Sequence, residues 1–117
     1  MNDRELLELA ARAAGYQFSY SYRSLSSPAV PVILAETGRW RQWDPRHDDG
    51  DALRLAVKLR FEVQCYPGMA SVIYDDGSPD GAYLQQNPEK GQSDEQATRR
   101  AIVRAAAEIG KSMGGGE

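Results

Sequence analysis

Residues 48–66 read DDGDALRLAVKLRFEVQCY, and this stretch decides the class of the fold. Its first half predicts a helix over Ala52–Leu59, with Asp51 as the N-cap residue. Its second half, Phe61–Tyr66, alternates apolar and polar residues, which is the period of a strand with one covered face. The chain therefore mixes helices and strands over short distances. The apolar stripe expected on the helix consists of Leu53, Ala56 and Val57, broadened by Leu55 and Leu59.

Cys65 is the only cysteine of the chain, and His47 is the only histidine. One cysteine excludes an intrachain disulfide, and the two residues together are too few for a Cys/His zinc site within one chain. Cys65 shares a strand face with Phe61 and Val63. We therefore expect a packed thiol and not a reactive one.

Two further helices are marked by their ends. Asn2 with Glu5 forms a capping-box pattern before a helix over Asp3–Ala14, and Ser93 with Gln96 forms another before a helix over Asp94–Lys111. Tight hairpins between the helices favour antiparallel or mixed pairing, so we expect an α+β domain with three helices and a sheet of about four to five strands. The strands are expected at Tyr16–Tyr22, Val32–Ala35, Arg39–Trp43, Phe61–Tyr66, Ala70–Tyr74 and, as a short edge strand, Ala82–Gln85.

The 117 residues are 41% hydrophobic and 26% charged, the proportions of one globular domain. We expect residues 1–113 to form that domain and the glycine-rich residues 114–117 to form a flexible tail. No apolar run approaches the roughly 18 residues of a membrane span, and the first residues are acidic where a signal peptide is basic, so we expect a cytoplasmic protein. The formal net charge of −3 disfavours general binding to nucleic acids.

Residues 39–47 read RWRQWDPRH and hold the strongest candidate site. In an extended chain, Arg39, Arg41 and Trp43 share one face, while Trp40 lies on the other. Arginine forks match phosphate geometry and an indole ring can stack on a base, so this segment predicts a nucleotide-like ligand. The candidate ligand-binding residues are Arg39, Trp40, Arg41, Trp43, Arg46 and His47, with Tyr20 from the aromatic strand.

A structural interpretation competes at each of these positions. One tryptophan can anchor the core while arginines solvate an edge strand, and His47 can make a local hydrogen bond. The cluster Arg99, Arg100 and Arg104 on the last helix is either an interaction surface or a solvated helix face.

Two acidic stretches resemble metal sites but have simpler explanations. Asp48, Asp49 and Asp51 are explained by the start of a helix, and residues 76–81 match only the early positions of a calcium loop. We therefore predict no metal and no cofactor. No phosphate-binding glycine motif occurs in the sequence.

Three segments resemble the phage α-β-α sandwich domain, a family of small phage and prophage proteins of unknown function that includes the NinX group. They are the opening helix at residues 6–15, the central run at residues 43–59 and the closing helix at residues 98–108. The resemblance implies a phage origin, action inside the infected bacterial cell and an α-β-α sandwich. It transfers no catalytic residue.

Three functions follow as hypotheses. The first is a non-enzymatic protein that sequesters a nucleotide-derived immune signal of the host. The second is an adaptor or inhibitor that binds a host or phage protein, and the third is a small enzyme that uses His47 with a nearby aspartate. We expect self-association in each case, because small domains often bury an apolar face in a symmetric dimer.

Overall fold

The computed structural model describes residues 2–21 and 29–113. It contains three helices and six strands in these residues. The predicted tail at 114–117 and Tyr22 of the predicted aromatic strand lie outside the described residues. In chain order, the elements are α1 (Asp3–Ala14), β1 (Phe18–Ser21), β2 (Val30–Leu34), β3 (Trp40–Gln42), α2 (Asp49–Lys58), β4 (Glu62–Tyr66), β5 (Met69–Tyr74), β6 (Ala82–Gln86) and α3 (Asp94–Met113).

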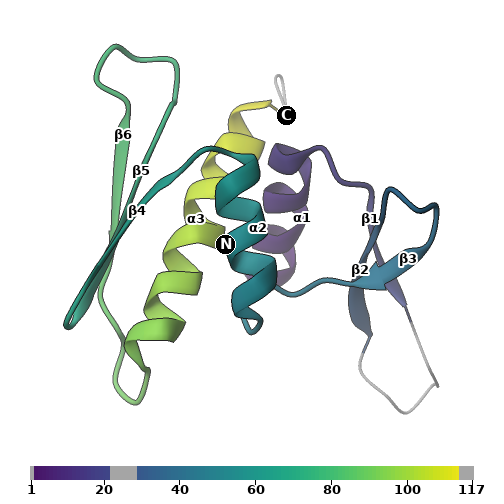
Figure 1. The fold of residues 1–117 in the computed structure, drawn as a ribbon, viewed down its shortest axis with the longest axis horizontal. Helices are drawn as coiled ribbons and strands as arrows, with labels where there is room; N and C mark the ends of the chain where they lie inside the picture. The colour runs from purple at the N-terminus through teal and green to yellow at the C-terminus, as the bar shows by residue number, and fades with distance from the viewer. Residues whose placement is uncertain (1, 22–28, 114–117) are drawn as a thin grey trace.

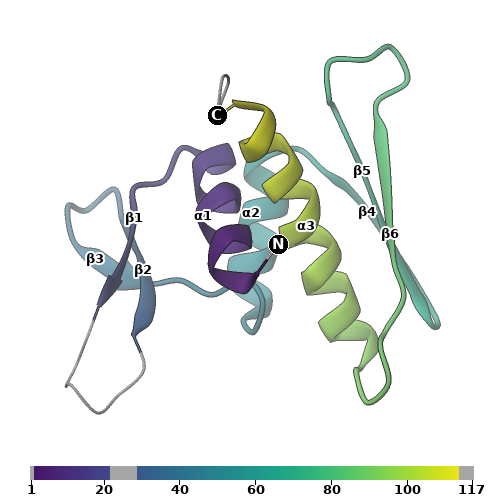
Figure 2. The ribbon, with the colours of Figure 1, turned by 180° about the vertical axis from the view of Figure 1, so that it is seen from behind.

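The helices form a central layer between two separate sheets (Figures 1 and 2). Both sheets are antiparallel, with strand orders β1-β2-β3 and β4-β5-β6. The predicted α+β class and the three helices are confirmed. The prediction of one sheet of four to five strands is wrong, and the order of layers is the inverse of an α-β-α sandwich. Within each sheet the strands pair only with their neighbours in sequence, and α2 lies between the two groups of three strands along the chain.

The predicted ends of α1 and the predicted start of α3 are confirmed. Asn2 Oδ1 accepts the backbone N–H of Glu5 at 2.9 Å, and Gly15 ends α1 with a left-handed φ of 77°. At α3, Ser93 Oγ accepts the N–H of Gln96 at 3.1 Å, while Gln96 Oε1 accepts the N–H of Ser93 at 2.7 Å. Local sequence therefore fixes where these two helices begin.

Helix α2 differs from the prediction in its cap and in its buried face. Asp48 is the N-cap residue, and Asp51 lies inside the helix with a buried carboxylate. The side chains turned to the core are those of Ala52, Leu55 and Ala56, whereas Leu53 and Val57 are exposed. Both sets of apolar residues on α2 have helical spacing, so the sequence alone does not tell which set is buried. Packing against α3 buries the set of Ala52, Leu55 and Ala56.

The prediction that Cys65 is packed is wrong. Its side chain does share a face of β4 with Val63, since both line the same groove, but Cys65 is exposed. This groove between β4, α2 and α3 leaves the thiol uncovered.

The core lies where α3 packs against α1 and against the sheet of β4–β6. Small residues allow the helices to approach closely, and at Gly110 an added Cβ would lie 2.7 Å from the carbonyl carbon of Leu9. No helix among the described residues has the length and apolar character needed to cross a bilayer. The core side chains of the helices are Leu6, Leu7, Ala10, Ala11, Ala14, Ala52, Leu55, Ala56, Ala101, Ile102, Val103, Ala105, Ala106 and Ala107.

Candidate functional site

The segment between β3 and α2 is held in place by Trp43. This side chain is 1% exposed, and its ring meets those of Tyr16 and Phe18 edge-on at centroid distances of 5.8 and 5.9 Å. Pro45 is also fully buried. These two anchors fix the path of the segment, so the polar residues between them point in defined directions.

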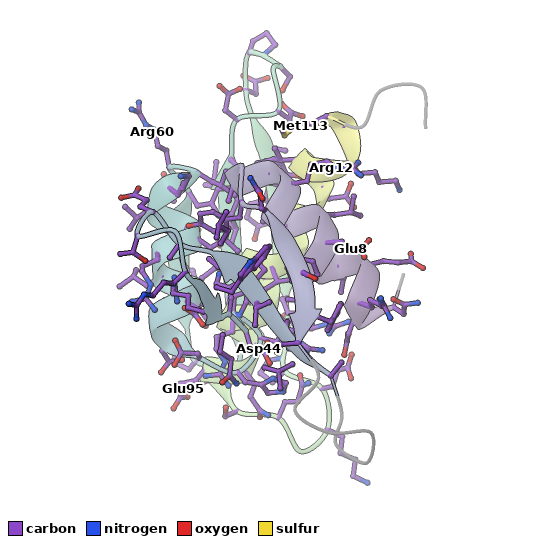
Figure 3. All side chains as sticks on the ribbon, turned by 90° about the vertical axis from the view of Figure 1, so that its right-hand side faces the viewer. Glu8, Arg12, Asp44, Arg60, Glu95 and Met113 are labelled. Atoms are coloured by element: carbon purple, nitrogen blue, oxygen red, sulfur yellow. The ribbon has the colours of Figure 1, made fainter. Side chains whose placement is uncertain are left out.

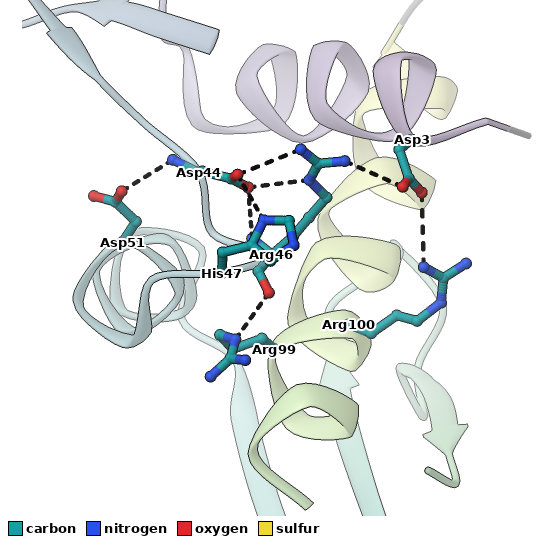
Figure 4. Close-up of polar contacts among 7 residues, drawn as sticks. All are labelled: Asp3, Asp44, Arg46, His47, Asp51, Arg99 and Arg100. Atoms are coloured by element: carbon teal, nitrogen blue, oxygen red, sulfur yellow. Dashed lines mark hydrogen bonds and ion pairs between the residues drawn. The ribbon is translucent and has the colours of Figure 1, made fainter. Parts of the chain in front are cut away.

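The carboxylate of Asp44 contacts the side chains of Arg46 and His47 in this segment (Figure 4). Its Oδ1 accepts from Nε of Arg46 at 3.0 Å, and its Oδ2 lies 2.7 Å from Nδ1 of His47 and accepts from Nη2 of Arg46 at 3.3 Å. Burial raises the pKa of Asp44, but the hydrogen bonds and positive charges of Arg46 and His47 outweigh burial, so the net pKa is lowered. Asp44 is therefore an ionised carboxylate that orients the Arg46 guanidinium and the His47 imidazole.

Asp51 is the second carboxylate of the network. Its Oδ2 accepts the backbone N–H of Asp44 at 3.0 Å, and its Oδ1 accepts from Arg54 at 2.8 Å and from Arg41 at 3.2 Å. Burial raises the pKa of Asp51, yet the hydrogen bonds from these three residues lower it further than burial raises it. Asp51 thus ties the start of α2 to β3.

Replacement of Asp51 should destabilise the fold in a pH-dependent way. We expect Asp51→Asn to lower the free energy of unfolding at pH 7 by about 1–3 kcal/mol, because the amide has no charge and replaces one of the two acceptor oxygens with an NH₂ donor. A lowered pKa stabilises the fold above the unfolded value of about 3.9, and this contribution is lost as pH falls through the folded value. In urea titrations, the difference between variant and wild type should therefore be nearly the same at pH 7 and pH 5 and smaller at pH 3. Exposed Asp80→Asn is the control, and equal pH profiles for all three proteins would contradict the prediction.

Two arginines connect this segment to α1 and α3. Arg46 Nη1 lies 3.1 Å from Asp3 Oδ2, and the other oxygen of Asp3 lies 3.7 Å from Arg100 Nη1. Arg99 donates to the backbone oxygen of Arg46 at 2.8 Å and pairs with Asp49 at 2.6 Å. Asp3 therefore bridges two guanidinium groups from different parts of the chain (Figure 4).

Arg46, His47 and Arg100 line one hollow of about 140 Å³. Its other polar lining residues are Asp3, Gln92 and Gln96. The side-chain oxygens of Gln92 and Gln96 accept backbone N–H groups, so their amide NH₂ groups are available as donors. The hollow thus collects cationic groups and neutral donors around a single carboxylate.

The remaining predicted ligand-binding residues do not meet at this hollow. Trp43 is in the core and has no free ring face, whereas Trp40 is 50% exposed on the opposite face of β3. Arg39 is exposed, and Arg41 is held by Asp51. Tyr20 lies under the guanidinium of Arg4, 4.6 Å from its ring centroid. The arginines and indole rings of residues 39–47, which were expected to hold one ligand together, are therefore divided between two faces.

The three arginines of α3 reach three different elements. Arg99 contacts the start of α2, Arg100 faces Asp3 of α1, and Arg104 donates to Gln86 Oε1 on β6 at 2.6 Å. Arg100 and Arg104 line a further hollow together with Leu6 and Glu108, and Arg99 is not part of it. Of the three, only Arg100 lines the hollow that Arg46 and His47 border.

A second hollow, of about 450 Å³, lies beside Arg41 and is unsuited to an anion. It is lined by Asp44, Asp48 and Asp51, against the cationic Arg41 and Arg54 and the edge of His47. The carboxylates already neutralise these arginines at 2.8–3.8 Å. A phosphate group here would face three aspartates.

His47 and Asp44 have the geometry of an oriented imidazole, in which Nδ1 faces a carboxylate. No serine, threonine or cysteine lines either hollow that His47 borders, within the part of the chain that the structure describes. The enzyme hypothesis centred on His47 stays a prediction, and loss of a measured activity in His47→Ala would be its test.

Sequence reasoning missed Asp3, Gln92 and Gln96 as lining residues. Each was visible only as part of a helix start, and the ends of α1 and α3 come together through packing over long sequence distances. Comparison of the chain with family models, with curated proteins and with solved structures gives no match.

Proposed function

We propose that the protein is a non-enzymatic binding protein that takes the anionic group of a small ligand into the hollow lined by Arg46, His47 and Arg100. The observation that supports this function is the convergence of these three side chains from two distant segments on one hollow. Charge-assisted hydrogen bonds from guanidinium groups are well suited to phosphate and carboxylate oxygens.

Asp3 occupies the place of a ligand anion in this proposal. Its carboxylate lies between Arg46 and Arg100 at 3.1 and 3.7 Å, and its side chain is 56% exposed. An exposed side chain near the end of a helix can move aside at low cost. An incoming phosphate would displace it and inherit both guanidinium groups.

The volume of the hollow limits what enters it. About 140 Å³ admits a phosphate-sized group but not a complete nucleotide. The remainder of a nucleotide would lie outside on the surface. Sequestration of a nucleotide-derived immune signal of the host is one form of this function, with the phosphate as the recognised part.

The test is a ligand panel read by thermal shift and by isothermal titration calorimetry. The probes are inorganic phosphate, ADP-ribose and cyclic dinucleotides. We expect Arg100→Ala to weaken binding of a positive ligand about 10- to 100-fold, because a hydrogen bond to a charged group contributes roughly 1.5–3 kcal/mol. Arg100 is the informative position, because Arg46 also holds Asp44.

Asp3→Asn should change the affinity for the ligand in the opposite direction. Removal of the competing carboxylate should tighten binding, whereas a purely structural role for Asp3 predicts no gain. Arg39→Ala, on an exposed segment away from the hollow, is the matched control and should bind as the wild type does. The proposal is overturned when no probe binds, or when Arg39→Ala and Arg100→Ala lose affinity equally.

A further inference from the structure

Helix α2 presents an apolar stripe to solvent with opposite charges at its two ends. Leu53 and Val57 are 63% and 68% exposed, one helical turn apart. Asp49 lies one turn before Leu53, and Arg60 follows the helix just after its C-terminal end. The order along the stripe is therefore acidic, apolar, apolar, basic.

An apolar groove of about 540 Å³ runs beside this stripe. It lies between α2, β4 and α3, and its apolar lining includes Leu53, Val63 and Ile102. Asp94 and Glu95 line it at the end where α3 begins, on the same side as Asp49. It shares no lining residue with the hollow lined by Arg46, His47 and Arg100, which we call the anion hollow after its proposed ligand, so the two features are independent.

We propose that this stripe and groove bind a second copy of the chain, with the two α2 helices packed antiparallel about a twofold axis. In this arrangement Leu53 of one copy lies opposite Val57 of the other, and the same contact is repeated by symmetry. The Val57 side chain then reaches the rim of the groove at Leu53. Formation of the dimer therefore removes both Leu53 and Val57 from contact with water.

Charge complementarity selects the second copy and the antiparallel direction. Arg60 and Glu95 lie at opposite ends of the molecule along α2 (Figure 3). The antiparallel pair places Arg60 of each copy next to the acidic end of the other, where Asp49, Asp94 and Glu95 gather. Asp49 pairs with Arg99 but stays 78% exposed, so its carboxylate can accept a second cation. A parallel pair would instead place acid against acid.

The interface is expected to be weak. A helix of 10 residues is about 15 Å long, which limits the contact to the low end of specific interfaces. We expect a dissociation constant of about 1–100 µM, so that the oligomeric state depends on concentration.

Sedimentation velocity at protein concentrations from below to above this dissociation constant tests whether the dimer forms. We expect the wild type to pass from monomer to dimer, and Val57→Glu to remain a monomer with an unchanged melting curve. Tyr83→Glu introduces the same charge at a side chain that is 57% exposed on β6, on the face of the sheet opposite to Val63, and it should dimerise normally. A wild type that is monomeric throughout, or a Val57→Glu variant that dimerises like the wild type, overturns the proposal.

Disulfide trapping tests the direction of the pair. Leu53→Cys and Val57→Cys are made separately in a Cys65→Ser background, which removes the only native thiol. On oxidation of the mixture, we expect the mixed dimer between positions 53 and 57 to form faster than either dimer of one variant. Preferential 53–53 and 57–57 products would show a parallel contact, and capture of a different protein through the groove without self-association would equally reject the second copy.

Discussion

Gly110→Ala is expected to lower the free energy of unfolding by about 3–5 kcal/mol, because it overpacks the contact between α3 and α1. The added Cβ would lie 2.7 Å from the carbonyl carbon and 3.1 Å from the Cα of Leu9. These are backbone atoms, so no side-chain rotation can relieve the overlap, and α1 has to move away from α3. That displacement would also separate Asp3 from Arg100 and open the anion hollow.

Helix propensity alone predicts the opposite change in the free energy of unfolding. Alanine is favoured over glycine in a helix by about 1 kcal/mol, so a glycine without close neighbours is stabilised by the same change. Gly50 provides this control, because its added Cβ would meet only the flexible ends of Arg54 and Asp48 at 3.1–3.2 Å. We expect Gly50→Ala to be neutral or slightly stabilising. Urea denaturation measures both variants, and a stabilised Gly110→Ala would refute the close approach of α1 and α3.

Local sequence predicted the elements of this fold better than their assembly. Capping residues such as Asn2 and Ser93 act within one turn, so the starts of α1 and α3 were predictable. The division into two sheets depends on contacts between distant segments, which periodicity does not encode. At α2, Asp48, Asp49 and Asp51 were all possible N-cap residues. Asp48 is the cap, and the carboxylate of Asp51 is buried in ion pairs with Arg41 and Arg54.

The candidate site was predictable in residue type but not in grouping. Residues 39–47 were expected to act together, yet strand alternation sends Trp43 inward and Trp40 outward. Arg46 and His47 instead meet Arg100, which lies more than fifty residues later and reaches them because α3 crosses the start of α1. The same packing supplied Asp3, whose role no local pattern revealed.

The two tryptophans should respond very differently to truncation. We expect Trp43→Ala to cost about 3–5 kcal/mol of stability, because it removes a fully buried ring and its edge contacts with Tyr16 and Phe18. Trp40→Ala should cost less than about 1 kcal/mol, since half of its surface is already exposed. Chemical denaturation monitored by circular dichroism measures both.

Fluorescence of the phenylalanine variants separates the two environments even where the alanine variant of Trp43 is too unstable to study. Trp40→Phe leaves only the buried indole of Trp43, whose emission should lie at short wavelength and resist quenching by iodide. Trp43→Phe leaves only the half-exposed indole of Trp40, whose emission should lie at longer wavelength and be quenched readily. Because Trp43 anchors the segment that carries Asp44 and Arg46, its replacement should also weaken binding at the anion hollow, whereas Trp40→Phe should not. Equal quenching of the two variants would contradict the burial of Trp43, and stronger quenching of Trp43 than of Trp40 would mean that β3 presents the opposite face to the core.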